Sequence, residues 1–240
     1  MNSDFSIAID DQKIATITWN CEKKSMNVLS FEALETLEKL IDQVIEDKNI
    51  NACILTSGKK DFAAGMDLNV LAQLKQSAGE NPAEGVFNGV MKMHAVLRKI
   101  ELAGMDSKTK KGGKPIVSVL PGTALGIGLE IPLSTHRIFA ANNSKAKIGL
   151  PEILVGLFPG AGGTTRLVRK LGAMAASTYL LEGKTVAPNK AQAAGIIDQV
   201  DEDPMKAARD WVLNATEGDL VKPWDQKGYK IPGGTPYTPN

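Results

Sequence analysis

The sequence contains few of the side chains that build metal centres and disulfide frameworks. Its 240 residues include two cysteines and two histidines, too few for a disulfide-rich scaffold or a histidine-based metal site. Cys21 and Cys53 lie near apolar runs typical of strands, so we expect both to be reduced core residues. We expect His94 to be an ordinary surface or boundary residue and His136 to be packed rather than catalytic. We therefore predict no metal site.

Excess charge of one sign and long apolar runs are also lacking. The 28 lysines and arginines balance 27 acidic residues, for a net charge of +1, which provides no field to attract nucleic acid. No apolar run approaches the ~20 residues that cross a bilayer. Residues 1–11 lack the basic and apolar regions of a signal peptide. We therefore predict a cytoplasmic protein with no nucleic-acid partner and no membrane span.

Common cofactor and nucleophile motifs are missing as well. No GxGxxG follows a predicted strand, which argues against a dinucleotide-binding fold, and there is no GxSxG nucleophile turn. The triplet at 183–185 resembles the end of a phosphate-binding P-loop, but position 178 is threonine where that motif requires glycine. These absences leave carboxylates as the candidate catalytic groups.

The hydrophobic pattern predicts an α/β protein. Two alternating runs, 5–9 and 14–19, predict a hairpin, and a helix and an apolar strand follow it, as in folds with crossover connections. Further strands are expected at 115–120, 136–140 and 146–148. Further helices are expected from 66 or 67 to 76, over 83–102, around Glu130 with Pro132 in or near its first turn, from 164, and over 173–181, 188–194 and 204–214.

The end of the chain differs from the rest in composition. Prolines and glycines recur from Gly218 onward and leave little room for a regular element. We therefore assign residues 1–217 to one domain and residues 218–240 to a linker or docking tail.

The stretch 121–166 contains two acidic residues in apolar surroundings, Glu130 and Glu152. Burying a carboxylate is costly unless it is paired or hydrogen-bonded, and burial raises its pKa. The pair is therefore a candidate acid and base. The alternative is that each glutamate only caps or bridges local backbone, since structural ion pairs perturb pKa values too.

Several separated motifs resemble the crotonase, or enoyl-CoA hydratase/isomerase, family. They are FAAGMDL, ALGIGLE, GLPEILVGLFPGAGGTTRL and TVAPNKAQAAGIIDQV, and the likeness spans about residues 5–200. The resemblance implies a crotonase-like (ββα) superhelix of stacked strand-helix units, followed by the Pro/Gly-rich tail.

Within this family the sequence is most similar to the hydratase part of the bacterial multifunctional fatty-acid oxidation α subunit. The tail looks like the junction that leads into a 3-hydroxyacyl-CoA dehydrogenase portion, which this sequence does not contain, so we expect a fragment, a gene split or a truncated chain. The resemblance implies an acyl-CoA substrate. It also implies either a homo-oligomer or association with a dehydrogenase domain and a thiolase.

The resemblance also assigns roles to residues. Two backbone N–H groups, those of Met66 and Ile127, would form an oxyanion hole for the thioester oxygen. Ile127 stands where the family has a small glycine, and its branched side chain restricts the backbone. Glu130 would act as base on the water that adds to the β carbon, and Glu152 would deliver a proton to the α carbon. Isomerases of the family typically need only the glutamate that corresponds to Glu152.

Coenzyme A, as part of the substrate, would be the only cofactor, held largely by backbone. The adenine would meet the carbonyl of Ala64, and the pantetheine arm would pass Ser25 and Met26. Lys24 is a candidate phosphate contact, with a solvated lysine as the alternative. Asp67 is expected to be structural, at a helix N-terminus. These features favour an enoyl-CoA hydratase of β-oxidation. The alternatives are a 3,2-enoyl-CoA isomerase or other crotonase-type enzyme, and a non-catalytic docking module for a dehydrogenase partner.

Overall fold

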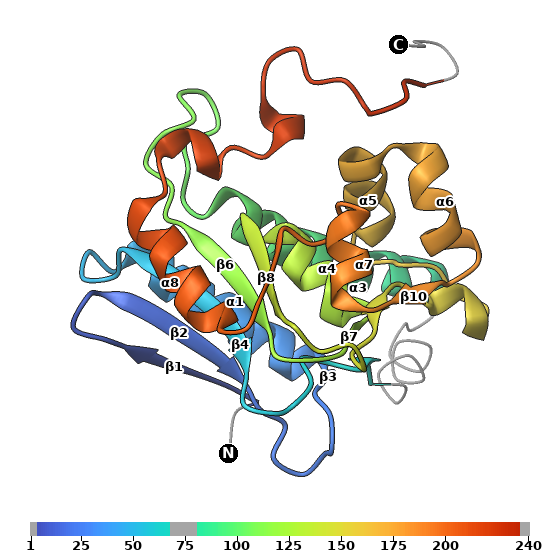
Figure 1. Cartoon of the computed structure of the whole chain (residues 1–240), viewed down its shortest axis with the longest axis horizontal. Helices are drawn as coiled ribbons and strands as arrows, with labels where there is room; N and C mark the ends of the chain where they lie inside the picture. Colours follow the sequence, from blue (N-terminus) through green and yellow to red (C-terminus); the bar gives the residue numbers. More distant parts are fainter. Residues whose placement is uncertain (1–3, 68–80, 236–240) are drawn as a thin grey trace.

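The computed structural model describes residues 4–67 and 81–235 of the chain. In this part of the chain, the largest sheet has six strands in the order β1-β2-β4-β6-β8-β11 (Figure 1). The strands are β1 (Phe5–Ile9), β2 (Ile14–Trp19), β4 (Ala52–Ser57), β6 (Ile116–Leu120), β8 (Arg137–Ala141) and β11 (Gln199–Asp201). β1 and β2 form the predicted antiparallel hairpin, and the other neighbours run parallel. The predicted α/β class is confirmed.

The central strands are buried on both faces. On β4, Cys53 and Leu55 join the larger core with residues of α1 and α3, whereas Ile54 joins a smaller core with residues of α8. Because successive side chains of a strand point to opposite faces, a strand covered on both sides is apolar throughout. The helices concerned are α1 (Phe31–Glu46), α3 (Pro82–Leu102) and α8 (Pro204–Asn214).

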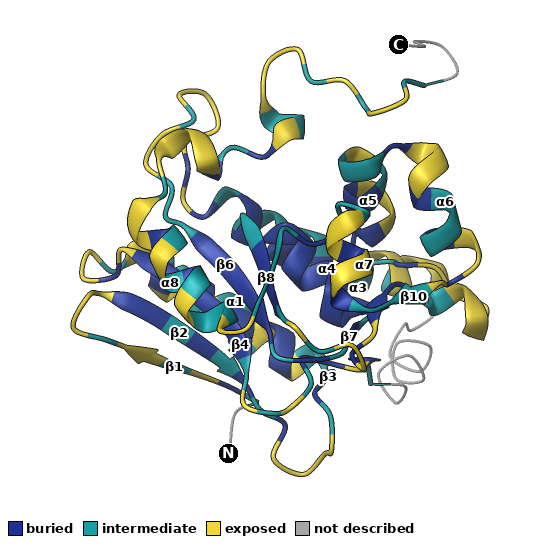
Figure 2. Cartoon of the chain, viewed as in Figure 1, coloured by how far each residue is buried: buried dark blue, intermediate teal, exposed yellow. Residues whose placement is uncertain are grey.

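A second layer of short strands and helices carries the stretch 121–166 apart from β8, which belongs to the large sheet. Its strands are β3 (Val28–Leu29), β5 (Gly65–Met66), β7 (Ala124–Leu125), β9 (Ile148–Gly149) and β10 (Thr185–Val186). Its helices are α4 (Ile127–Ser134), the 3₁₀ turn η1 (Glu152–Val155), α5 (Gly163–Leu171), α6 (Ala173–Leu181) and α7 (Pro188–Ala193). Every residue of α4 is buried (Figure 2), which explains why this helix is apolar on all sides.

Three details of the predicted elements are wrong. Met66 belongs to β5 and does not begin a helix, and the rest of that predicted helix lies largely outside the described residues. Pro132 is the sixth residue of α4 and therefore lies in its second turn, where a buried apolar position outweighs the missing N–H. The strands expected at 136–140 and 146–148 begin one and two residues later. No helix in residues 4–67 and 81–235 is long and apolar enough to cross a bilayer.

The tail folds back onto the body through polar contacts. It contains two 3₁₀ turns, η2 (Glu217–Leu220) and η3 (Pro223–Asp225). Between them, the buried Lys222 donates hydrogen bonds to the carbonyls of Leu133 and Thr135. The division of the chain at residue 217 stays a prediction.

Asn27, which the sequence analysis missed, joins the loop after β2 to three other segments. Its side chain is fully buried. Its Oδ1 accepts from Cys21 N at 2.9 Å. The two hydrogens of its Nδ2 are shared among three acceptors, the carbonyls of Trp19 and Phe62 at 3.0 and 2.9 Å and Ser57 Oγ at 2.9 Å. This amide therefore positions the loop that carries the predicted coenzyme A contacts.

We expect Asn27→Leu to lower the free energy of unfolding by about 3 kcal/mol, because it leaves several buried polar groups without a partner. Urea unfolding measures this loss. Asn49→Leu is the matched control, since Asn49 is exposed on the turn after α1, and it should change stability by less than about 0.5 kcal/mol. Equal losses in the two variants would contradict the structural role of Asn27.

Candidate active site

The two glutamates singled out in the sequence lie close together in the fold. Glu130 is in the first turn of α4, and Glu152 is the first residue of η1. Glu130 is 3% exposed, and the charge of Glu152 contributes to raising its pKa. The fold therefore brings together two carboxyl groups that are 22 residues apart in the sequence.

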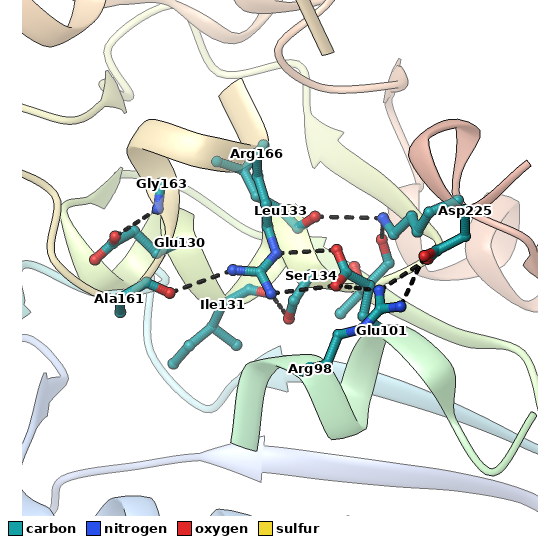
Figure 3. A network of polar contacts seen from close by, with 12 residues as sticks. Arg98, Glu101, Glu130, Ile131, Leu133, Ser134, Ala161, Gly163, Arg166 and Asp225 are labelled. Carbon is teal, nitrogen blue, oxygen red and sulfur yellow. Dashed lines mark hydrogen bonds and ion pairs between the residues drawn. The ribbon is translucent and has the colours of Figure 1, made fainter. Parts of the chain in front are cut away.

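Glu130 lies against the N-terminus of α5. Its Oε1 accepts a hydrogen bond of 2.7 Å from the backbone N–H of Gly163, the first residue of α5 (Figure 3). A Cβ at position 163 would come within 2.9 Å of the same oxygen, so glycine is needed for this approach. Burial raises the pKa of Glu130 to about 8, and the charge of Glu152 acts in the same direction, whereas the Gly163 bond opposes both. Glu130 is therefore mostly protonated at neutral pH.

Glu152 faces the turn that begins α4. A Cβ at Gly126 would lie 3.2 Å from Glu152 Oε1. The other oxygen, Oε2, is buried and has no hydrogen-bond partner among the described residues. Burial raises the pKa of Glu152 as well. A buried polar atom without a partner costs free energy, so this oxygen is poised to bond to a ligand or water.

The two predicted oxyanion-hole donors follow glycines on adjacent segments. Gly65, with φ of 124°, precedes Met66, and Gly126, with φ of 56°, precedes Ile127. These segments meet at a parallel bridge between Ala63 and Ala124. Both glycines adopt backbone conformations that other residues disfavour. The backbones at Met66 and Ile127 therefore turn next to each other, beside Glu152.

The N–H of Met66 is not used by two neighbouring backbone bonds to the β3 segment. Ala64 N donates to Asn27 O at 2.9 Å, and Asp67 N donates to Leu29 O at 3.0 Å. The register of the two strands is consecutive, with Val28 opposite Gly65 and Leu29 opposite Met66. Neither bond uses the N–H of Met66.

The helix that carries Ile127 packs directly on the segment before Met66. A Cβ at Gly128 would come within 2.7 Å of Ala63 Cβ, so glycine permits this contact. The Ile127 side chain is 3% exposed and belongs to the larger core. The side chain thus contributes to packing, and the backbone of Ile127 forms the first residue of α4.

The predicted coenzyme A contacts lie on neighbouring segments. Lys24, Ser25 and Met26 are in the loop between β2 and β3, and the bond from Ala64 N to Asn27 O places Ala64 beside the end of that loop. Lys24 Nζ forms an ion pair with Asp67, although 46% of the Lys24 side chain is exposed. This pairing adds a third possibility for Lys24, besides a phosphate contact and full solvation.

The two histidines have structural contacts. His136 Nδ1 accepts from the backbone N–H of Ile116 at 2.9 Å, and burial, together with the charge of Lys222, lowers the pKa of His136 to about 3. His136 is thus neutral and packed, as predicted. His94 is half-buried, with its Nε2 2.8 Å from the carbonyl of Gly160.

Sequence reasoning missed a buried ion pair next to the glutamates. Glu101 and Arg166 are 2% and 6% exposed. Arg166 donates from Nε to Glu101 Oε1 at 3.0 Å and from Nη1 to the carbonyl of Ala161 at 3.2 Å. An available signal was the position of Glu101 between Ile100 and Leu102, at the apolar end of the predicted helix over 83–102.

Comparison with known proteins shows the family of the chain. Residues 10–217 match the enoyl-CoA hydratase/isomerase family. The chain is 31% identical over 201 residues to the fatty acid oxidation complex subunit alpha of Shewanella oneidensis, a match covering 83% of this chain and 26% of that protein. The corresponding protein of Shewanella amazonensis is 32% identical over the same length. The chain thus spans about a quarter of the length of these relatives.

Solved structures indicate the same family. The enoyl-CoA hydratase of Bacillus anthracis has a TM-score of 0.73 and 26% identity, with 93% of this chain and 81% of that chain covered. The enoyl-CoA hydratase of Thermoplasma volcanium has a TM-score of 0.74 and 26% identity, with 92% and 81% covered. The chain belongs to the enoyl-CoA hydratase/isomerase family and has the crotonase fold, which confirms the resemblance and fold predicted from its motifs.

The raised pKa of Glu130 predicts a pH-dependent stability. Between about pH 4.5 and 8 the folded protein keeps a proton that the unfolded chain releases, so the free energy of unfolding falls as pH rises through this window. Glu130→Gln removes this dependence. We expect the stability of the natural protein relative to the variant to fall by about 2 kcal/mol from pH 6 to pH 8.

Urea unfolding of both proteins at the two pH values measures this difference. Groups common to both proteins, such as Lys222, cancel in the comparison. A difference in stability that is independent of pH would show that Glu130 titrates normally in the folded state.

Proposed function

We propose that the chain is an enoyl-CoA hydratase, a lyase that adds water across the 2,3 double bond of a 2-enoyl-CoA to give a 3-hydroxyacyl-CoA. The observation that carries this proposal is the pairing of Glu130 with Glu152, whose Oε2 is buried without a partner in the described structure. Membership of the hydratase/isomerase family supports an enzyme of this kind. Two carboxyl groups suit a reaction that moves two protons.

Addition of water to the double bond places negative charge on the thioester oxygen. The backbone N–H groups of Met66 and Ile127 are proposed to bind that oxygen. Both follow glycines with positive φ on adjacent segments. Ile127 is the first residue of α4, whose dipole favours negative charge at this end. Donors already held in place stabilise the charge without reorganising during the reaction.

The two glutamates are proposed to handle the protons. In hydration, Glu130 takes a proton from water as the water oxygen bonds to the β carbon, and Glu152 gives its proton to the α carbon. This requires Glu130 ionised and Glu152 protonated. The pKa of Glu130 in the ligand-free protein, raised to about 8, suits the reverse reaction. In that direction Glu130 protonates the leaving hydroxyl group. Because the charge of Glu152 contributes to the raised pKa of Glu130, the titration of Glu130 depends on that of Glu152.

Substrate binding is proposed to use the loop before β3. The carbonyl of Ala64 would accept from the adenine, and the pantetheine arm would pass Ser25 and Met26. For Lys24 to contact a phosphate, it must leave Asp67 or share its charge with that residue. No cofactor besides coenzyme A itself is proposed.

The names of the Shewanella relatives support a role in fatty-acid β-oxidation. We propose that the chain acts in the cytoplasm, either as a homo-oligomer or in association with a dehydrogenase domain and a thiolase. Co-purification with such partners from cell extract would test the second arrangement, and the mass of the purified protein in solution would test the first.

The alternative within the same family is a 3,2-enoyl-CoA isomerase, and the family description covers both activities. The experiment that separates them supplies crotonyl-CoA in one assay and a 3-enoyl-CoA in another. Loss of the conjugated thioester absorbance reports hydration, and its appearance reports isomerisation. Turnover of crotonyl-CoA supports the hydratase. Isomerisation without hydration would overturn it, and coenzyme A binding with neither reaction would indicate a docking module.

A further inference from the structure

A chain of charged contacts connects the C-terminal turn η3 to the loop before α5. Asp225 accepts two hydrogen bonds, of 2.7 and 2.8 Å, from the guanidinium of Arg98. Arg98 also donates to Glu101 at 2.7 Å. Glu101 binds Arg166, and Arg166 holds the carbonyl of Ala161 at 3.2 Å. Figure 3 shows these contacts as one network that ends beside the bond from Gly163 to Glu130.

The loop that positions Glu130 depends on Arg166. Gly162 has φ of 105°, and a Cβ at this position would overlap the Nη1 atom of Arg166. The guanidinium therefore occupies the space where a side chain at 162 would lie. Since the next residue, Gly163, donates to Glu130, a shift of Arg166 would move the donor that orients this carboxyl group.

The polar network, rather than close packing, makes the connection to η3. A cavity of about 530 Å³ is bounded by α3, α5 and η3, and Arg98, Glu101, Arg166, Trp224 and Asp225 contribute to its lining. Across such a space there is little van der Waals contact to transmit a position. Displacement of η3 would therefore reach the first turn of α5 through the ion pairs, whereas the direct contact of η3 with α5, the Trp224 ring 5.9 Å from the guanidinium of Arg169, lies in the last turn of that helix.

The same segment also contacts the helix that carries Glu130. Lys222 Nζ donates to the carbonyls of Leu133 and Thr135 at the C-terminal end of α4, where a positive group is favoured. Residues 222–225 thus contact one end of α4 through Lys222 and contact α3 through the bond from Arg98 to Asp225, from which the ion pairs continue to α5. Glu130 lies between these two contacts, bonded to α5 and carried by α4.

We propose that Asp225 and Lys222 are positioning residues, which hold Glu130 in its working geometry. Asp225 acts through Arg98, Glu101 and Arg166, and Lys222 acts through the C-terminal end of α4. This inference rests on the proposed function, because it concerns the rate of the same reaction. The proposal gives the turn η3 a role in turnover and none in coenzyme A binding. The predicted contacts with coenzyme A, the 24–26 loop and Ala64, lie at the N-terminal end of α4.

The test compares Asp225→Asn, Asp225→Glu and Glu217→Gln. Glu217 is a matched control in the same tail, since its carboxylate is 61% exposed and lies 4.0 Å from Lys111, outside the network. Asp225→Asn should lower kcat for hydration about 10-fold with KM changed less than 2-fold, because small misplacements of a catalytic group are costly. Asp225→Glu should recover part of the rate, and Glu217→Gln should match the natural protein.

Backbone amide exchange provides a readout that does not need activity. In Asp225→Asn, exchange should become faster in residues 159–166 and stay unchanged in β4. Unchanged exchange and kcat would overturn the proposal, and so would equal acceleration in β4, which indicates general destabilisation. If the natural protein hydrates no substrate, the proposed function fails, while the exchange measurement still decides whether η3 holds this loop.

Discussion

Glu152→Gln is expected to lower kcat for hydration of crotonyl-CoA at least about 1,000-fold, within the range that general acid–base catalysis contributes. Glutamine has the size of glutamate but cannot donate an acidic proton to the α carbon. Glu152 Oε2 is buried without a partner in the described structure, and burial raises the pKa of this carboxyl group. The site therefore provides an acid where the reaction needs one. The decline of the conjugated thioester absorbance measures the rate.

Two controls accompany this variant. Glu182→Gln removes an exposed carboxylate and should leave kcat unchanged. Binding of coenzyme A to Glu152→Gln should stay within about 2-fold of the natural protein, since the predicted coenzyme A contacts are on the 24–26 loop and at Ala64. A kcat within 10-fold of the natural value would exclude Glu152 as the proton donor.

Glu130→Gln separates the two reactions of the family. Hydration should fall by a similar factor of at least about 1,000, because no base remains to accept the proton of water. Isomerisation moves a proton without adding water. The resemblance to the family implies that this reaction requires only the glutamate that corresponds to Glu152. A variant at Glu130 that retained isomerisation would support this division of roles.

The second large expected effect concerns stability. Glu101→Gln is expected to lower the free energy of unfolding by about 3–5 kcal/mol, because it leaves the buried guanidinium of Arg166 without its counter-charge. Arg166 is 6% exposed and makes two hydrogen bonds to Glu101, of 3.0 and 3.3 Å. Replacing both residues, as in Glu101→Gln with Arg166→Met, should cost less than the sum of the single changes.

Urea unfolding of the single and double variants measures these values. Glu38→Gln is the matched control, because Glu38 pairs with Lys99 on the surface with 31% of each side chain exposed. An exposed pair of this kind contributes less than about 1 kcal/mol. A loss at Glu101 no larger than that at Glu38 would show that water or another group compensates Arg166.

Much of the fold could be predicted from local pattern. The hairpin at 5–19, the helix over 83–102 and the helix over 204–214 follow from apolar periodicity and capping residues, which act over a few neighbours. Predicted boundaries were less accurate where tertiary contacts decide them. Met66 belongs to β5 because it pairs with Leu29, a residue 37 positions earlier in the sequence, and no local signal specifies that pairing.

The candidate site likewise has residues that local pattern could predict and residues that only tertiary contacts reveal. Glu130 and Glu152 could be selected because acidic residues in apolar runs are rare unless they are paired or functional. Asn27 and Glu101 were missed, because their partners come from distant segments. Asn27 also resembles an ordinary loop residue in the sequence, although in the fold it bonds to Ser57 and Phe62, 30 and 35 residues away.

The sequence by itself determined the α/β pattern, the family motifs and the candidate acid–base pair, because each depends on residue type and short-range spacing. The tertiary structure alone decided that Glu130 is almost fully buried, with its pKa raised to about 8. It also decided that the C-terminal turn reaches the loop beside Glu130 through Arg98 and Asp225, which are 127 residues apart. Burial and long-range ion pairs arise only when distant segments pack, and they set the proton affinity and position on which the proposed chemistry depends.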